Sequence, residues 1–243
     1  MKLPVMFVDQ FDEAHSRDIE PMRRGHGDDY YWQLVSYVRR YKGARPLPKL
    51  VPKPIAIDGA FEDWRDGQPE FRDTVGDPVR REHRGWDAKV TYRNDTGRND
   101  FVAAKVSWDN ERVYFYARTR EPITPPTGTN WMTLLIDADS NATTGWLGYD
   151  FAVNYPGAGL LTRHVGTEAV FDWKIVANSG VQVKWKEREL ELAIPWRALD
   201  LERPKTLDFK WADKCLEKAD WSDFTLNGDT APNDRFNYRA VPR

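Results

Sequence analysis

The feature that most constrains the fold is a series of short strand-like segments between residues 88 and 211. They are rich in Val, Tyr, Phe, Trp and Thr, and turn signals such as Asp109-Asn110, Asn178-Ser179-Gly180 and Lys186-Glu187 separate them. The expected strands are 88–93, 101–108, 112–118, 131–137, 149–154, 168–176, 181–185, 188–194 and 207–211. Because no helical pattern intervenes, we predict an all-β fold, an antiparallel β-sandwich.

The first 54 residues follow a different pattern. Residues 3–11 form an apolar run typical of a buried strand, and residues 28–43 read as a helix that ends at Gly43. Residues 44–54 contain four prolines and read as a linker. We therefore predict a strand–helix appendage over 1–43, a linker over 44–54 and the sandwich over 55–243.

Charge and composition exclude several classes of partner. The 243-residue chain has 36 basic and 38 acidic residues and no long run of one sign, so neither nucleic acid nor a membrane surface is an expected partner. No apolar segment approaches the roughly 20 residues that cross a bilayer, and the first residues do not form a signal peptide. Cys215 is the single cysteine, which excludes an intrachain disulfide and a cysteine-built metal site. The cellular compartment stays open.

The chain is unusually aromatic, with 11 Trp, 10 Tyr and 11 Phe. Most of these rings are expected in the core. Trp and Tyr also offer flat apolar faces with a polar edge, which suit a sugar ring with its apolar face and hydroxyl rim. The composition therefore favours a saccharide as ligand.

The stretch LLIDADSNATTGWLGYDFAVN, residues 134–154, carries the candidate metal site. Asp137, Asp139 and Asn141 lie two residues apart, the spacing that opens a calcium loop of alternating oxygen ligands. A hard cation needs six to eight oxygens, so Asp150 is a further candidate. The loop lacks the glycine and the final Glu of an EF-hand, and the alternative is a polar turn without a cation.

The β-region resembles the family-nine type of carbohydrate-binding module, within the wider DOMON-like group of β-sandwiches. The matching segments are Ile55-Ala56-Ile57-Asp58-Gly59 with Asp63-Trp64, the hairpin 106–114, residues 134–154, Glu191-Leu192-Ala193-Ile194-Pro195-Trp196, and Gly228-Asp229-Thr230-Ala231-Pro232. The resemblance implies a non-catalytic module that binds saccharide or polysaccharide, often beside a glycoside hydrolase, with calcium supporting its loops.

The N-terminal segment is similar to the last strand, loop and helix of barrel-type glycoside hydrolase-like proteins. Asp12-Glu13 stands where that family has an Asn-Glu pair, and one strand with one helix cannot close an eight-stranded barrel. We therefore expect no enzymatic activity from this chain alone. The alternative is that it is the C-terminal part of a glycoside hydrolase that acts only in the full-length protein, with a catalytic domain as partner and an extracellular or periplasmic location.

Four tryptophans are candidates for stacking on a sugar. Trp86 follows Arg84-Gly85 in a loop, Trp131 opens a strand after a Pro- and Gly-rich loop, and Trp173 lies between Asp172 and Lys174. Trp146 is flanked by glycines, and the alternative for it is that it folds back and caps the sandwich. Trp108, Trp196 and Trp211 have apolar neighbours and are expected in the core.

Other reactive residues give weaker patterns. Glu13 and Glu20 are a candidate carboxylate pair of a glycosidase, but the barrel that would hold them in a cleft is missing. His83 and His164 have too few partners for a zinc site. Some DOMON-like sandwiches bind haem, for which Met132 or His164 would be the ligand candidates. This is the least favoured function.

Overall fold

The computed structural model describes residues 52–67, 69–76, 78, 81–84, 91–167, 170–216, 223–233 and 236–242. The predicted strand–helix appendage, and the linker as far as residue 51, lie outside them. The chain divides into two compact units, one of Met1–Pro48 with Arg81–Arg93 and one of Lys49–Arg80 with Asn94–Arg243. In the first unit, β2 (Arg81–Arg84) pairs with β3 (Thr91–Asn94), whose last residue is counted with the second.

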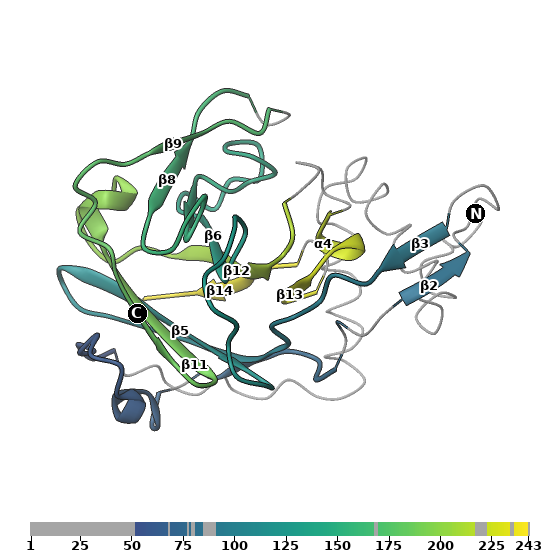
Figure 1. Ribbon diagram of the computed structural model, residues 1–243. Helices are drawn as coiled ribbons and strands as arrows, with labels where there is room; N and C mark the ends of the chain where they lie inside the picture. The colour runs from purple at the N-terminus through teal and green to yellow at the C-terminus, as the bar shows by residue number, and fades with distance from the viewer. Residues whose placement is uncertain are drawn as a thin grey trace, which may run out of the picture. The chain divides into compact units, whose positions relative to one another are not determined.

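The second unit is a sandwich of two antiparallel sheets, which confirms the predicted fold class. The first sheet has the order β1 (Phe71–Arg72), β4 (Phe101–Trp108), β5 (Arg112–Thr119), β11 (Glu189–Pro195) and β10 (Gln182–Lys186). The second has the order β13 (Asp229–Ala231), β12 (Leu207–Asp213), β6 (Thr133–Asp137), β7 (Phe151–Val153), β8 (Leu161–His164) and β9 (Trp173–Ile175), and β14 (Tyr238–Ala240) also pairs with β12. In Figure 1, β5 and β11 run side by side in one layer, and β6 and β12 lie in the other.

Within the described part of the chain, helices are few and short. The described residues contain the 3₁₀ turns η3 (Phe61–Trp64) and η4 (Trp196–Leu199) and the α-helical turn α4 (Asp223–Leu226). Among these residues, no helix has the length and apolar character needed to cross a bilayer.

The core lies between the two sheets and follows from the alternation of the strands. On β11, Leu190, Leu192 and Ile194 are fully buried and face this core. Phe209 and Trp211 of β12 meet them from the other sheet, and both are also fully buried. Burying a large apolar side chain contributes about 1.5–3 kcal/mol, so this layer is the main source of stability.

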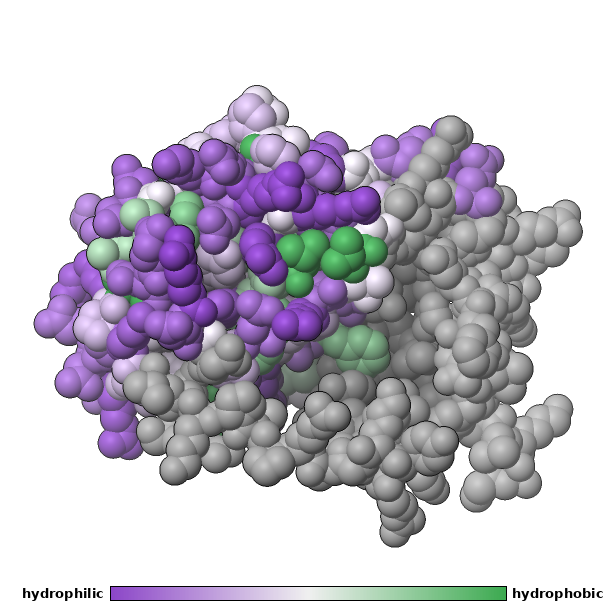
Figure 2. Space-filling model, turned by 90° about the horizontal axis from the view of Figure 1, so that it is seen from below, coloured by the Kyte–Doolittle hydropathy of each residue, from purple (hydrophilic) through white to green (hydrophobic). Residues whose placement is uncertain are grey.

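The outer face of the first sheet is covered by the segment that contains η3. Trp64 packs there with Tyr116 at a ring-centroid distance of 5.4 Å. The Glu191 carboxylate, from β11, is fully buried beneath this segment and accepts hydrogen bonds from Asp58 N, Gly59 N and Trp64 Nε1. The Ile-Asp-Gly and Asp-Trp residues of the sequence motif therefore pack onto one buried carboxylate. Among the residues coloured in Figure 2, hydrophilic side chains predominate and hydrophobic side chains form a few groups.

The outer face of the second sheet carries its own apolar cluster. It is formed by Leu135, Trp146, Leu147, Tyr149, Ala152, Ala212, Cys215, Leu216 and Phe224. Trp146 and Tyr149 come from the β6–β7 loop, and Phe224 comes from α4. Because loop residues cover the sheet here, its middle is closed to a ligand and its ends stay accessible.

Candidate functional site

The β6–β7 loop is folded around its own carboxylates. Asp137, at the end of β6, accepts hydrogen bonds through Oδ1 from Ser140 N at 2.6 Å and Asn141 N at 3.2 Å. Asp139 Oδ1 accepts from Asn141 N at 2.8 Å and from Thr144 Oγ1 at 3.1 Å. The Asn141 side-chain oxygen is used within the loop, where it accepts from Thr143 N and Oγ1. Asx-type turns of this kind hold the loop in one shape.

A tight turn then brings the chain back to β7. Trp146 and Tyr149 exchange two backbone hydrogen bonds of 2.9 Å, so residues 146–149 form a small closed turn. Gly145 has φ +65°, and a Cβ at this position would lie 2.2 Å from Tyr149 O. Only glycine fits here, which explains the Gly-Trp pair of the sequence. The turn places Asp150 beside the start of the loop, where its Oδ2 accepts from Ala138 N at 2.9 Å.

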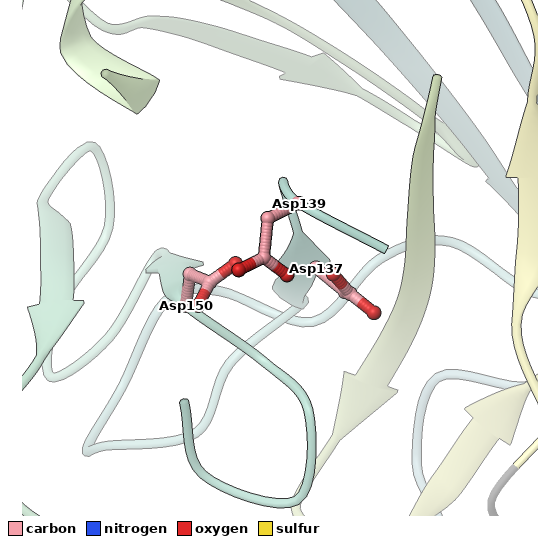
Figure 3. Close-up of side chains that lie close together, drawn as sticks. All are labelled: Asp137, Asp139 and Asp150. Carbon is pink, nitrogen blue, oxygen red and sulfur yellow. The ribbon is translucent and has the colours of Figure 1, made fainter. Parts of the chain in front are cut away.

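Three of the four predicted metal ligands lie together. One carboxylate oxygen from each of Asp137, Asp139 and Asp150 lies within 4.8 Å of the other two. Figure 3 shows the carboxylates of Asp139 and Asp150 facing each other, with Asp137 at the end of β6 beside them. Such a group of oxygens could hold a metal ion, and a hard cation is the type that all-oxygen sites prefer. For Asn141, the structure shows only the hydrogen bonds within the loop.

Electrostatics at this cluster disfavour three bare charges. Asp137 is only 4% exposed. Desolvation by burial and the nearby charges of Asp150 and Asp208 raise the pKa of Asp137 to about 7. Burial also raises the pKa of Asp150. Asp208 of β12 is the cross-strand partner of Asp137. The Arg239 guanidinium donates a hydrogen bond of 2.7 Å to each carboxylate oxygen of Asp208. Either protons or a cation would relieve the repulsion among the other three carboxylates.

A cleft of about 400 Å³ opens beside the cluster. It is lined by Ala138, Asp139, Gly145, Asp150, Phe151, Arg163, His164, Gly166, Leu199, Asp200, Leu201 and Lys205. Two of the cluster carboxylates, Asp139 and Asp150, therefore belong to its wall. The remaining polar lining comes from β8, from the loop that follows it, and from the segment after η4.

An ion pair also lines the cleft. Arg163 of β8 contacts Asp200 at 2.6 Å (Nη1 to Oδ2), and both side chains are more than half exposed. Asp200 caps η4 with φ +57°, and its backbone N–H donates to Arg197 O. The Arg163 guanidinium also lies over the Phe151 ring at 5.8 Å. Packing thus orients a planar donor group and a carboxylate toward the same space.

His164 joins the cleft to the aromatic cluster behind it. Its Nε2 lies 2.6 Å from Val170 O, and its ring meets Trp173 edge-on at 5.3 Å between centroids. Trp173 is half-buried, and its indole N–H has no hydrogen-bond partner among the described residues. The predicted stacking residue Trp173 therefore lies behind the cleft wall.

The other predicted stacking tryptophans are not exposed at the cleft. Trp146 and Trp131 are both 1% exposed, so neither ring has a face open to a ligand. Trp146 packs on the outer face of the second sheet, which is the capping alternative, and Trp131 belongs to the core between the sheets. Trp86 lies outside the described residues.

Sequence reasoning missed three polar residues of the cleft, Arg163, Asp200 and Lys205, and considered His164 only as a zinc or haem ligand. Their signal in the sequence was weak because they come from a short strand and a loop far apart in the chain. It also missed Trp185, which is 40% exposed on β10. The alternating residues 182–186 around Trp185 are typical of an edge strand. This pattern does not predict whether the Trp185 ring is exposed.

The remaining candidates are not brought together. Met132 is fully buried between the sheets and does not line the cleft, whereas His164 does. The two proposed haem ligands therefore do not share a pocket. His83 lies on β2, in the other unit, and Glu13 and Glu20 lie outside the described residues.

Comparison with known proteins does not identify a family for this chain. No protein-family model and no curated protein matches it. A distant structural match is the crystal structure of a "putative carbohydrate-binding protein" from Bacteroides uniformis ATCC 8492, which is 13% identical and covers 60% of this chain and 71% of its own, with a TM-score of 0.32. At this identity and TM-score, the likeness assigns neither a ligand nor a residue role to this chain.

Proposed function

We propose that this β-sandwich is a non-catalytic carbohydrate-binding module whose saccharide occupies the cleft beside the Asp137 loop. The observation that carries the proposal is the convergence of planar polar side chains on one cleft. Asp139, Asp150 and the Arg163–Asp200 ion pair all line it. Vicinal hydroxyls can donate to carboxylates and accept from a guanidinium at the same time, so such a wall matches a sugar rim.

The size and nature of the cleft agree with a short saccharide. Its volume of about 400 Å³ falls in the range of small-molecule sites, roughly 300–1,000 Å³. The segment resemblance to family-nine-type modules, given above, supports the same ligand class. The ordered loop and the buried Asp137 supply a rigid support for the cleft wall.

We propose that calcium is the cation held by Asp137, Asp139 and Asp150. The donor set consists of carboxylate oxygens only, which fits a hard cation and disfavours zinc or copper. The cation would neutralise carboxylates that burial and mutual repulsion otherwise destabilise. Its role would be to hold the β6–β7 loop and thereby the position of Asp139 and Asp150 in the cleft wall.

Titration calorimetry against a panel of oligosaccharides tests the proposed function. We expect wild-type protein with calcium to bind at least one saccharide, and Arg163→Ala to weaken that binding about tenfold or more because a charged donor is lost. Arg118→Ala is the matched control, an arginine on the β5 strand of the other sheet. Absence of binding to every saccharide, by a protein that is folded and calcium-loaded, would refute the proposal.

The absence of catalysis is part of the same proposal. The alternative, a C-terminal part of a glycoside hydrolase, predicts that this chain alone is inactive and that a longer protein containing it hydrolyses the bound saccharide. Assaying the chain for release of reducing ends from the saccharide that it binds distinguishes a binding module from an enzyme. Turnover by the isolated chain would overturn the non-catalytic assignment.

A further inference from the structure

Trp185 is a large apolar side chain left partly uncovered at the edge of the sandwich. It lies on β10, the last strand of the first sheet, and is 40% exposed. Its cross-strand partner on β11 is Leu190, which is fully buried in the core. Paired residues project from the same face of a sheet, so Trp185 lies on the core-facing side of the first sheet. Because β10 is the edge strand, part of its ring is exposed to solvent there.

A second tryptophan holds this ring in place. Trp131 meets Trp185 at a 68° interplanar angle, with 5.0 Å between the ring centroids. Trp131 is buried, and its Nε1 donates to Thr124 O at 2.7 Å. Thr124 is in turn bonded to Asn99 through both its backbone N and its side chain, at 3.0 and 3.1 Å. The exposed indole therefore rests on a fixed support, and little conformational entropy is lost when a ligand contacts it.

The surroundings of Trp185 argue against a second protein sheet as its partner. Lys184 and Lys186 flank it on the same edge strand, and both are exposed. Lysines on an edge strand oppose pairing with another sheet, because their charges would have to be desolvated. Side chains alternate along a strand, so both lysines project from the face opposite to Trp185, and a saccharide stacked on the ring would leave their ammonium groups hydrated.

We propose that Trp185, supported by Trp131, is a second saccharide-contacting surface, on which a pyranose unit stacks with its C–H face. Trp131 lies two residues before β6 and Asp137 ends this strand, whose five residues span about 15 Å. The surface is therefore separate from the cleft. Because it is a sheet edge, it suits an interior unit of an unbranched chain better than a chain end. The proposal rests on carbohydrate binding as the function of the module.

The test uses cellohexaose, xylohexaose and mannohexaose as probes with calcium-loaded protein. We expect Trp185→Ala to weaken binding of the best hexasaccharide about tenfold, since a central aromatic contact is removed, and Trp185→Phe to weaken it less. Ile175→Ala, which trims an exposed apolar side chain on the other sheet, is the matched control and should bind like wild type. Thermal unfolding of each variant separates a folding defect from lost affinity.

A second readout addresses the ring directly. In an ¹H–¹⁵N spectrum, the indole N–H signal that disappears in Trp185→Phe belongs to Trp185, and we expect it to shift on addition of the hexasaccharide. If that signal stays still and both Trp185 variants bind like wild type, whereas Arg163→Ala fails to bind, the inference is wrong and the proposed function stands. If the wild-type protein binds no saccharide, both fail. A concentration-dependent dimer that Trp185→Ala abolishes would assign the surface to a second copy of the chain and overturn the inference.

Discussion

At the scale of single residues, Glu191 is an unusual element of the sandwich, because a fully buried carboxylate links two distant segments. It accepts three hydrogen bonds from residues 58–64, of 3.0, 2.7 and 3.0 Å. Burial raises its pKa, although the three donors oppose the shift. The energetic role of Glu191 is therefore to pair donors that would otherwise be buried without partners.

Glu191→Gln should lower the free energy of unfolding by about 1–3 kcal/mol, the cost of a buried unpaired polar group. Glutamine can still accept from Asp58 N and Gly59 N, but its amide N–H would then face the Trp64 indole N–H, two donors in contact. Trp64→Phe removes that conflict, so the effect of Glu191→Gln should be smaller in the Trp64→Phe background. Urea unfolding of the four proteins measures the coupling, and strictly additive effects would contradict the hydrogen-bond account.

Asp137 leads to a pH prediction for the metal-free protein. Its pKa is about 7 in the folded state, against 3.8 ordinarily. Between these values the folded state binds a proton that the unfolded state releases, so this residue makes stability fall as the pH rises from about 4 to 7. Asp137→Asn keeps the acceptor oxygen for Ser140 N and loses the charge. With a chelator present, the variant should gain stability over wild type as the pH rises through this window. A stability difference between the variant and wild type that stays constant with pH would contradict the raised pKa of Asp137.

At the scale of elements, the sequence predicted the long strands well, and among the short strands it predicted β6 and β10 but missed β1, β8, β13 and β14. Strands β4, β5, β11 and β12 were expected within two residues of their observed ends, because alternation over five or more residues is a strong signal. Strand β8, Leu161–His164, was missed since its four residues follow Pro- and Gly-rich sequence. The cleft residue Arg163 went unrecognised with it, and His164 was considered only as a zinc or haem ligand.

The metal loop and the tryptophans show what local sequence can and cannot specify. Ligand spacing predicted Asp137, Asp139 and Asn141, and the oxygen count of a hard cation added Asp150. Of these four, Asp137, Asp139 and Asp150 lie together, because the turn at Gly145 returns the chain to the start of the loop. Ring exposure depends on which distant segments cover a face. Trp146 is buried by packing with Phe171 and Phe224, which are separated from it by 25 residues or more. Trp185 stays exposed because the sheet ends at β10.

Gly145→Ala tests the turn between β6 and β7. The added methyl group would clash with Tyr149 O at 2.2 Å, in a conformation with φ +65° that favours glycine. We expect a loss of about 2–4 kcal/mol in the free energy of unfolding, together with weaker cation binding. Gly128→Ala is the control: φ is +76° there, but nothing lies within 4 Å of the added Cβ, so only the backbone cost of about 1 kcal/mol remains. Similar losses in the two variants would show that the close approach does not matter.

At the scale of the whole molecule, the second sheet connects the two proposed contact regions. Strand β6 begins after Trp131, which supports Trp185, and ends at Asp137, which anchors the acidic cluster. The sheet is held between two apolar layers, one facing the first sheet and one beneath the β6–β7 loop. Occupancy of the acidic cluster should therefore act on the unfolding of the entire sandwich rather than on one loop.

Calcium should raise the thermal stability of the protein if the cluster binds it in the folded state alone. At a calcium concentration about 100 times the Kd, linkage adds about 2.7 kcal/mol, which is on the order of 5–10 °C in Tm for a sandwich of this size. Asp139→Asn removes one ligand without burying a new group, because Asp139 is exposed, and should abolish most of the shift. Asp63→Asn, in the turn η3 that covers the first sheet, is the control and should leave the shift intact. Calorimetric scans of wild type and the two variants, with chelator and with added calcium, measure these shifts. Identical Tm values of the wild-type protein in the two conditions would exclude a calcium-stabilised loop.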